Sequence, residues 1–315
     1  MPTDADSPAA HHEALVPDRV QLSPALEVSK RPSPIERIKH LWQYRELIGN
    51  LTRKELKVKY KNSILGFFWS LLNPLMYLVV FSIVFNIISD VPVPYYGILF
   101  LSGLLAWNLF STGLSAGTIA ITSNAQLVTK VWFPRESLVL ASVFSAMVHF
   151  ALQGLVLLAA MLAFRRPPDL EYLPVLALAF LVTLTLCTAL AIGLSAVNVY
   201  LRDTQHLLEV AMLAWFWLSA IAYPYGQIVT KIEQRWGASY EWLLHLNPMI
   251  TVVVSFQRML YNPDWSDPHE AAVLPPHHMS WYLTHLGIAL GVSLVLLYGA
   301  LALFSRLEDN FAEEI

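Results

Sequence analysis

Two sets of side chains in this sequence are suited to binding a ligand, and the first is a group of cations. Five of them lie just before the first long apolar stretch: Arg53, Lys54, Lys57, Lys59 and Lys61. Such a basic collar can attract a phosphate or pyrophosphate group, because charge-assisted hydrogen bonds to phosphate are strong. It can equally anchor the chain on anionic lipid or contact a cytoplasmic partner, and the sequence leaves these roles open.

The second set consists of aromatic rings inside that apolar stretch. Four side chains recur every fourth residue and therefore share one face of a helix: Asn73, Tyr77, Phe81 and Phe85. Three more rings crowd the start of the stretch: Phe67, Phe68 and Trp69. Ring faces stack well on the C–H faces of sugars, so the set can line a sugar path. Membrane-interface belts and helix packing use the same residue types, and both alternatives stay open.

Other familiar chemistry is missing from the sequence. No glycine is followed by lysine, which excludes a P-loop for ATP, and there is no GxSxG or HExxH motif. Cys187 is the only cysteine, so no intramolecular disulfide or thiolate-cluster metal site is expected. His269, Glu270 and the pair 277–278 lie in a proline-rich segment that fixes no ligand spacing. The sequence predicts no catalytic residue, no metal and no cofactor.

Composition places these side chains in a membrane protein. The mean hydropathy is +0.51, with 56% apolar and only 14% charged residues. A helix needs roughly 20 apolar residues to cross ~30 Å of hydrocarbon. Six stretches qualify: 64–88, 95–117, 137–164, 173–197, 207–225 and 281–305. We therefore predict an all-α integral membrane protein with six transmembrane helices.

The distribution of cations sets the orientation of this predicted domain at 64–305. With a cytoplasmic N-terminus, fifteen of the 20 Lys and Arg residues fall in cytoplasmic segments, which also makes the C-terminal tail 306–315 cytoplasmic. The longest connection, 226–280, is then outside. Asn247-Pro248 divides its apolar part, so we expect re-entrant or interfacial helices there.

The segment before the first span has an organisation of its own. Residues 1–34 are rich in Pro, Ala, Ser and charge, which is typical of a disordered cytoplasmic tail. Residues 35–63 predict amphipathic interface helices. We expect a break at Gly49-Asn50, and a second short helix that starts at the capping-box spacing of Thr52 and Glu55.

The predicted cytoplasmic loop 122–136 is a candidate contact for another protein. Ser123 or Asn124 can cap a helix over 124–133, and Pro134 ends it. Its candidate coupling residues are Leu127, Val128, Lys130, Val131, Trp132 and Arg135. Such a helix either rests on the membrane or fits a groove of a partner, and periodicity alone does not decide.

Four segments together resemble one family. "LTRKELKVKYKNSILGFFWSLLNPLMYLVVFSIVF", "SGLLAWNLF", "NAQLVTKVWFPRE" and "LNPMITVVVSFQRMLY" are similar, in order, to the membrane subunit of polysaccharide-exporting ABC transporters. This is the Wzm-type O-antigen, galactan and teichoic-acid permease family of type-2 ABC exporters. The long N-terminal tail is the main departure from its pattern.

The resemblance implies a function and a set of partners. It implies a homodimer in the inner or plasma membrane, joined to two separate ATP-binding cassette subunits that hydrolyse ATP. The substrate would be a polysaccharide on an undecaprenyl-type lipid, with Arg53, Lys57 and Lys61 as candidate ligands of the pyrophosphate headgroup. The alternative is a type-2 exporter of small lipophilic drugs or lipids. A membrane enzyme would need a cluster of His, Asp or Glu at a membrane face, and none is visible.

Overall fold

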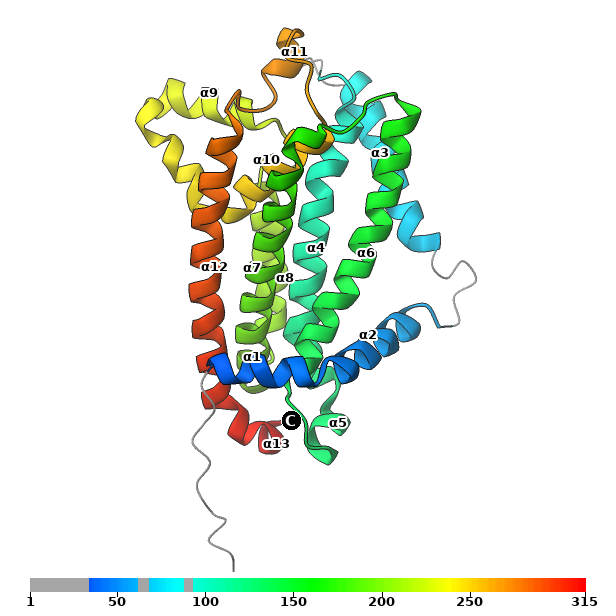
Figure 1. Cartoon of the computed structure of the whole chain (residues 1–315), viewed down its shortest axis with the longest axis vertical. Coiled ribbons are helices and arrows are strands. Elements are labelled where there is room, and N and C mark those ends of the chain that lie inside the picture. Colours follow the sequence, from blue (N-terminus) through cyan, green and yellow to red (C-terminus); the bar gives the residue numbers. More distant parts are fainter. Residues whose placement is uncertain (1–33, 62–67, 88–92) are drawn as a thin grey trace, which may run out of the picture. The chain divides into compact units, whose positions relative to one another are not determined.

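The computed structural model describes residues 34–61, 68–87 and 93–315, and within them every regular element is helical (Figure 1). The predicted tail at 1–34 lies outside these residues except for Pro34. The N-terminal half contains α1 (Pro34–Gln43), α2 (Arg45–Lys59), α3 (Phe68–Ile87), α4 (Tyr96–Ser123), α5 (Ala125–Lys130) and α6 (Glu136–Ala163). The C-terminal half contains η1 (Leu170–Tyr172), α7 (Leu173–Tyr200), α8 (Thr204–Trp217), α9 (Tyr225–Trp236), η2 (Ala238–Leu246), α10 (Pro248–Leu260), α11 (Pro268–Ala271), α12 (Met279–Leu307), η3 (Glu308–Asn310) and α13 (Phe311–Glu314).

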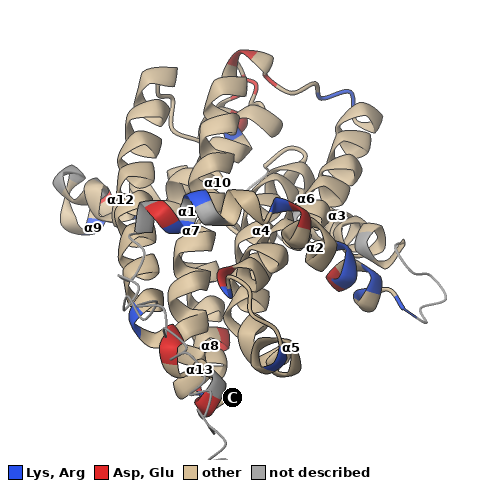
Figure 2. Ribbon diagram, turned by 60° about the horizontal axis from the view of Figure 1, so that its bottom comes forward, with Lys and Arg blue, Asp and Glu red and all other residues tan. Residues whose placement is uncertain are grey.

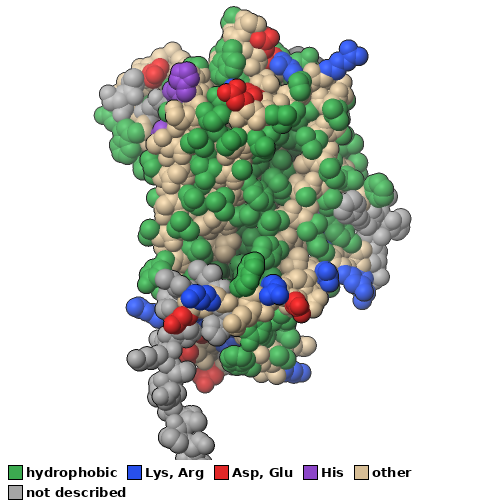
Figure 3. Space-filling model, viewed as in Figure 1, with side chains coloured by type: hydrophobic (Ala, Val, Ile, Leu, Met, Phe, Trp, Pro, Cys, Tyr) green, Lys and Arg blue, Asp and Glu red, His purple; other side chains and the backbone are tan. Residues whose placement is uncertain are grey.

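Four helices among the described residues are long and apolar enough to cross a membrane: α4, α6, α7 with η1, and α12 with η3. Their bounds lie within a few residues of four predicted spans. Two shorter apolar helical stretches, 71–84 within α3 and 248–260 in α10, accompany them. Figure 3 shows hydrophobic side chains across the middle of one face, with charged side chains gathered toward its two ends. This distribution is the one a bilayer requires.

The helix α4 forms the centre of the packed core, between α6 and α7, and α12 packs on the far side of α7 (Figure 1). The close approach of α4 to α7 depends on Gly113 and Gly117, one helical turn apart. A methyl group on Gly113 would lie 2.7 Å from Sγ of Cys187, and one on Gly117 would lie 2.7 Å from Cβ of Ala191. Small residues at this spacing let membrane helices pack backbone to backbone. The absence of side chains at these two glycines therefore sets how closely α4 and α7 pack.

Two features of α2 differ from the sequence predictions. The break predicted at Gly49-Asn50 is wrong, because α2 runs continuously from Arg45 and the interruption falls at Tyr44. Thr52 does not cap a new helix; its Oγ1 donates to the carbonyl of Ile48 at 2.8 Å inside α2. Pro74 lies inside α3, and the helix continues through it, as the predicted span at 64–88 requires.

The predicted fifth span, 207–225, is also shorter than expected. Its helix α8 ends at Trp217 after 14 residues, or about 21 Å, and a turn containing Ala220 at φ 54° leads into α9. The Asn247-Pro248 boundary is confirmed: Asn247 Oδ1 accepts the backbone N–H of Met249 at 3.0 Å, and Pro248 opens α10. Every residue of α10 from Met249 to Leu260 is buried.

Candidate translocation and coupling sites

The candidate pathway residues lie along α3, to the extent that the structure describes them. Phe67 is outside the described residues, as is the side chain of Phe85. Phe68 and Trp69, at the start of α3, are 67% and 53% exposed, and Asn73 is also exposed. In this chain alone, the start of the predicted sugar path is therefore open on its surface.

Farther along α3, the aromatic stripe contacts α4. The ring of Phe81 stacks on Phe100 with centroids 3.8 Å apart, and Tyr77 lies 6.2 Å from both of these rings. Tyr77 keeps 38% of its surface exposed, whereas Phe81 is partly buried against the core. Tyr77 thus stands at the edge of the packed cluster, where it can meet both a ligand and its neighbouring rings.

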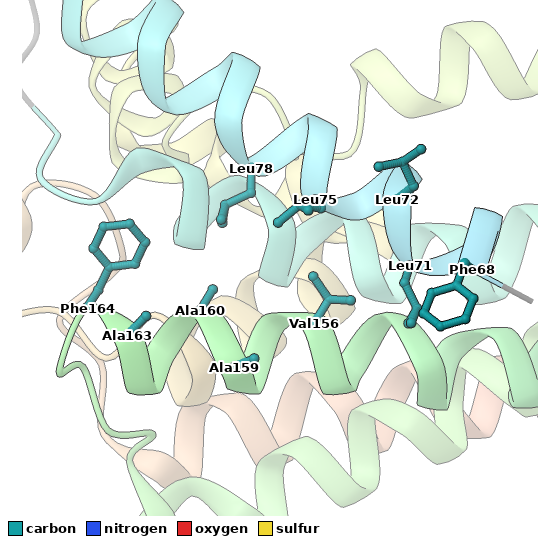
Figure 4. A pocket seen from close by; sticks show the side chains of 10 residues that line it. All are labelled: Phe68, Leu71, Leu72, Leu75, Leu78, Val156, Ala159, Ala160, Ala163 and Phe164. Carbon is teal, nitrogen blue, oxygen red and sulfur yellow. The ribbon is translucent and has the colours of Figure 1, made fainter. Parts of the chain in front are cut away.

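A groove separates α3 from α6 on another face of α3 (Figure 4). Its volume is about 600 Å³. Five residues of α3, four of α6 and Phe164 directly after α6 line it, and all are apolar: Phe68, Leu71, Leu72, Leu75, Leu78, Val156, Ala159, Ala160, Ala163 and Phe164. The small side chains come from α6 and the large ones mainly from α3. Sequence reasoning missed this groove, because small residues in an apolar run give no signal of their own.

Figure 2 shows Lys and Arg positions of the basic collar along α2, and all five collar cations are exposed. The candidate headgroup ligands Arg53, Lys57 and Lys61 are all exposed at the end of α2 or just beyond it. Lys54 is exposed as well, but its Nζ donates to Asn124 Oδ1 at 2.8 Å, which joins α2 to the start of α5. Lys59 lies against α6, where its Nζ is 3.0 Å from Nε2 of His149. Two of the five exposed cations, Lys54 and Lys59, thus also connect helices.

The segment around α5 leaves the helical core at the same end as α1 and α13 (Figure 1). The predicted helix over 124–133 is shorter in the structure, because α5 ends at Lys130 and Val131 is already extended. Val128 is buried and Leu127 packs on the core, so these two attach the helix. Lys130 and Val131 are exposed, and Trp132 is 88% exposed. The indole is therefore presented beyond the end of α5.

A buried ion-pair cluster lies directly after this segment. Arg37 of α1 contacts the carboxylates of Glu136, at the start of α6, and Glu308, after α12. Arg135 donates to the backbone carbonyl of Glu308, and its guanidinium lies 5.5 Å from the ring centre of Phe311. Burial alone would lower the pKa of Arg37, but the hydrogen bonds and charges of the two carboxylates raise it above its ordinary value. The cluster ties α1, α6 and α12 together beside α5.

A second pair of ion pairs braces the opposite end. Arg258 of α10 pairs with Asp169 at 3.0 Å, and its guanidinium lies 3.7 Å from the ring centre of Tyr172. Arg166 contacts Glu270, next to the short helix α11. These contacts hold the connection between α6 and α7 against the segment 258–270. They hold these two connections together, and the sequence prediction did not pair any of them.

The chain as a whole matches known proteins. Residues 46–261 match the ABC-2 type transporter family. The chain is 30% identical to the O-antigen export system permease protein RfbA of Myxococcus xanthus, over 89% of this chain and 100% of that protein. It is 25% identical to an O-antigen export system permease protein RfbA of Klebsiella pneumoniae, over 85% of this chain and 94% of that protein.

The matched residues contain the structural features described above. They include the collar, the aromatic helix α3, the segment around α5 and the buried helix α10, and the family match alone spans more than half of the chain. Together with four long apolar helices, they confirm the resemblance drawn from the sequence. The chain is a membrane protein and belongs to the ABC-2 type transporter family.

Proposed function

We propose that this chain is the permease subunit of an ABC exporter that moves a lipid-linked polysaccharide from the cytoplasm to the outer face of the inner or plasma membrane. The observation that carries the proposal is the match, over 89% and 85% of this chain, to permeases named for O-antigen export. The substrate is a polymer on an undecaprenyl-type carrier. The exposed rings at the start of α3 and the exposed cations at the end of α2 suit its sugars and its pyrophosphate.

A separate ATP-binding subunit supplies the energy in this proposal. The chain has no P-loop, and permeases of the ABC-2 family work with separate ATPases. The segment presented by α5 is the surface for that partner, because Trp132 is a large apolar side chain that is almost fully exposed on a cytoplasmic segment. Lys130 and Arg135 flank it and suit a partner with acidic residues.

Six spans complete the proposed architecture. The four long helices are joined by α3 and by α8 together with the residues up to 224. Both termini then lie in the cytoplasm, α1 lies in the membrane interface, and α9 to α11 lie outside. The amphipathic placement of α1 supports this assignment: Arg37 and Leu41 are buried against the bundle, whereas Trp42 is 73% exposed toward its surroundings.

The exporter is proposed to be a symmetric dimer with the path at its interface. The helix α8 supports this, because Leu208 and Met212 are buried while Leu207, Val210 and Leu213 on another face are 65–70% exposed. In a Cys187→Ala background, single cysteines at the three exposed positions should form cross-linked dimers. Cysteines at the two buried positions are the control and should not. Equal cross-linking of both sets, or none from an active protein, would argue against the dimer.

Aromatic exchange tests the path along α3. Tyr77→Phe and Phe81→Trp keep a ring face, so export should continue, whereas Tyr77→Leu and Phe81→Leu should reduce it several-fold at equal protein level. Loss of the Phe81–Phe100 stacking costs about 0.5–1.5 kcal/mol of packing. Thermal stability of each variant must therefore be measured beside surface glycan. If both Leu variants export at the native rate, the rings only pack the helix and the path runs elsewhere.

Depletion of the chain from cells that depend on it tests the proposed substrate. Lipid-linked glycan should accumulate on the cytoplasmic side and surface polysaccharide should fall. If the glycan distribution is unchanged and a small lipophilic compound accumulates instead, the chain belongs to the alternative class, an exporter of small lipophilic drugs or lipids. Renewed expression of the chain should return surface polysaccharide to its native level and clear the accumulated lipid-linked glycan.

A further inference from the structure

The contact between α2 and α6 is an unusual group of polar side chains beside a membrane helix. Both ring nitrogens of the buried His149 are engaged: Nε2 lies 3.0 Å from Lys59 Nζ, and Nδ1 lies 3.0 Å from the hydroxyl of Tyr60. A charged ammonium can only donate, so Nε2 accepts from it and the neutral ring carries its proton on Nδ1. His149 therefore positions Lys59 and contributes no positive charge.

Lys59 is a cation that lacks an anionic partner within the part of the chain that the structure describes. No carboxylate there forms an ion pair with it, and Glu55, one turn earlier, accepts instead from Ser142 Oγ at 2.8 Å. Burial against α6 lowers the pKa of Lys59, since it penalises the charged form. Its side chain nevertheless remains accessible. An anion that reached Lys59 would restore the balance of charge.

The apolar groove supplies a second binding element on the same helix. Val156, which lines it, follows His149 by seven residues, so the two lie on one face of α6 about 10 Å apart. The groove continues from there toward Phe164, between α6 and α3 (Figure 4). All of its lining side chains are apolar. A cation followed by an apolar groove matches a molecule with a phosphate at one end and a hydrocarbon chain at the other.

We propose that Lys59, Tyr60 and His149 bind the phosphate of the lipid carrier while its hydrocarbon chain lies in the groove between α3 and α6. The inference rests on the proposed function and makes it more specific. It places the carrier between α3 and α6, on a different face of α3 from the aromatic stripe that contacts α4. Lys57 and Lys61 then serve for approach, and Lys59, which His149 positions, serves for binding.

Equilibrium binding to the full chain in nanodiscs tests the proposal without any transport. The probe is geranylgeranyl phosphate, compared with geranylgeraniol, which has the same chain without the phosphate, and with inorganic phosphate. Lys59→Gln should weaken binding of geranylgeranyl phosphate at least tenfold and leave geranylgeraniol unchanged, and Lys59→Arg should retain most of the affinity. Lys39→Gln on α1 removes one exposed cation elsewhere and should change nothing.

The groove is tested separately with the same probes. Ala159→Phe fills it and should weaken both lipid probes, whereas Leu158→Phe, next to it but outside the lining, should not. Native affinity of Lys59→Gln for geranylgeranyl phosphate would overturn the phosphate site, and native affinity of Ala159→Phe would overturn the groove. Inorganic phosphate binding as tightly as the lipid would overturn the lipid assignment. If the chain exports glycan but these variants bind normally, only this inference fails, because the depletion experiment tests the function independently.

Discussion

Trp132→Asp is expected to abolish export while the protein stays inserted and folded. The indole is 88% exposed beyond the end of α5, so its removal disturbs no packing within the chain. At a partner's surface, a central Trp typically contributes about 2 kcal/mol or more, and an aspartate in its pocket would leave a buried charge without a partner. Affinity for the ATP-binding subunit should fall at least roughly thirtyfold. Co-purification and surface glycan measure the two effects.

Gln126→Asp is the matched control for this prediction. Gln126 is exposed on α5, six residues before Trp132, and is polar, so the substitution adds the same charge to the same segment. It should leave partner binding within about twofold of the native protein. A Trp132→Asp variant that co-purifies with the partner and exports at the native rate would remove α5 and its flanking residues as the docking surface.

Glu136→Ala is expected to cause the largest loss of stability among single substitutions. Glu136 is 2% exposed and contacts Arg37, which is itself buried. Removing one partner of a buried ion pair typically costs about 3–5 kcal/mol, because the remaining charge is left uncompensated. Glu308 retains part of the compensation, so the lower end of this range is expected. The melting temperature of the purified protein and proteolysis of α1 report the loss.

A double-mutant cycle separates this pair from general damage. Arg37→Met combined with Glu136→Met should be less destabilising than the sum of the single variants, because both buried charges are removed together. Glu46→Ala, at an exposed carboxylate of α2, should be within about 0.5 kcal/mol of the native protein. If Glu136→Ala melts at the native temperature, the cluster does not hold α1 on the bundle.

The long helices could be predicted from the sequence because one physical signal dominates them. Apolar runs such as 137–164 are bounded by proline and charge, and α6 begins and ends within a residue of that prediction. The short helices depend on weaker terms. Glycine inside a helix is less stable than alanine by roughly 1 kcal/mol. At Gly49 the burial of Ile48 and Leu51 outweighs this cost, so the helix continues. Likewise α5 ends at Lys130, before the periodicity would end it.

The polar contacts could not be predicted, because they join residues far apart in the chain. Arg37 meets Glu136 and Glu308 across 99 and 271 residues, and Lys59 meets His149 across 90. The sequence marks each as a charged or ionisable residue but does not pair them. The two ring nitrogens of His149 contact Lys59 and Tyr60, so His149 links α6 to the end of α2. The partner helix α2 lies far from α6 in the chain, so the residue pattern of α6 does not identify it.

Reconstitution tests the central claim most directly. The chain and the ATP-binding subunit that co-purifies with it are placed together in sealed vesicles that contain lipid-linked polysaccharide on the ATP-accessible face. The account predicts that ATP moves the glycan to the opposite face, where an added glycosidase no longer reaches it, and that Trp132→Asp abolishes this movement. Glycan that remains fully accessible after ATP hydrolysis by the native complex, while a small lipophilic compound is transported, would contradict the account.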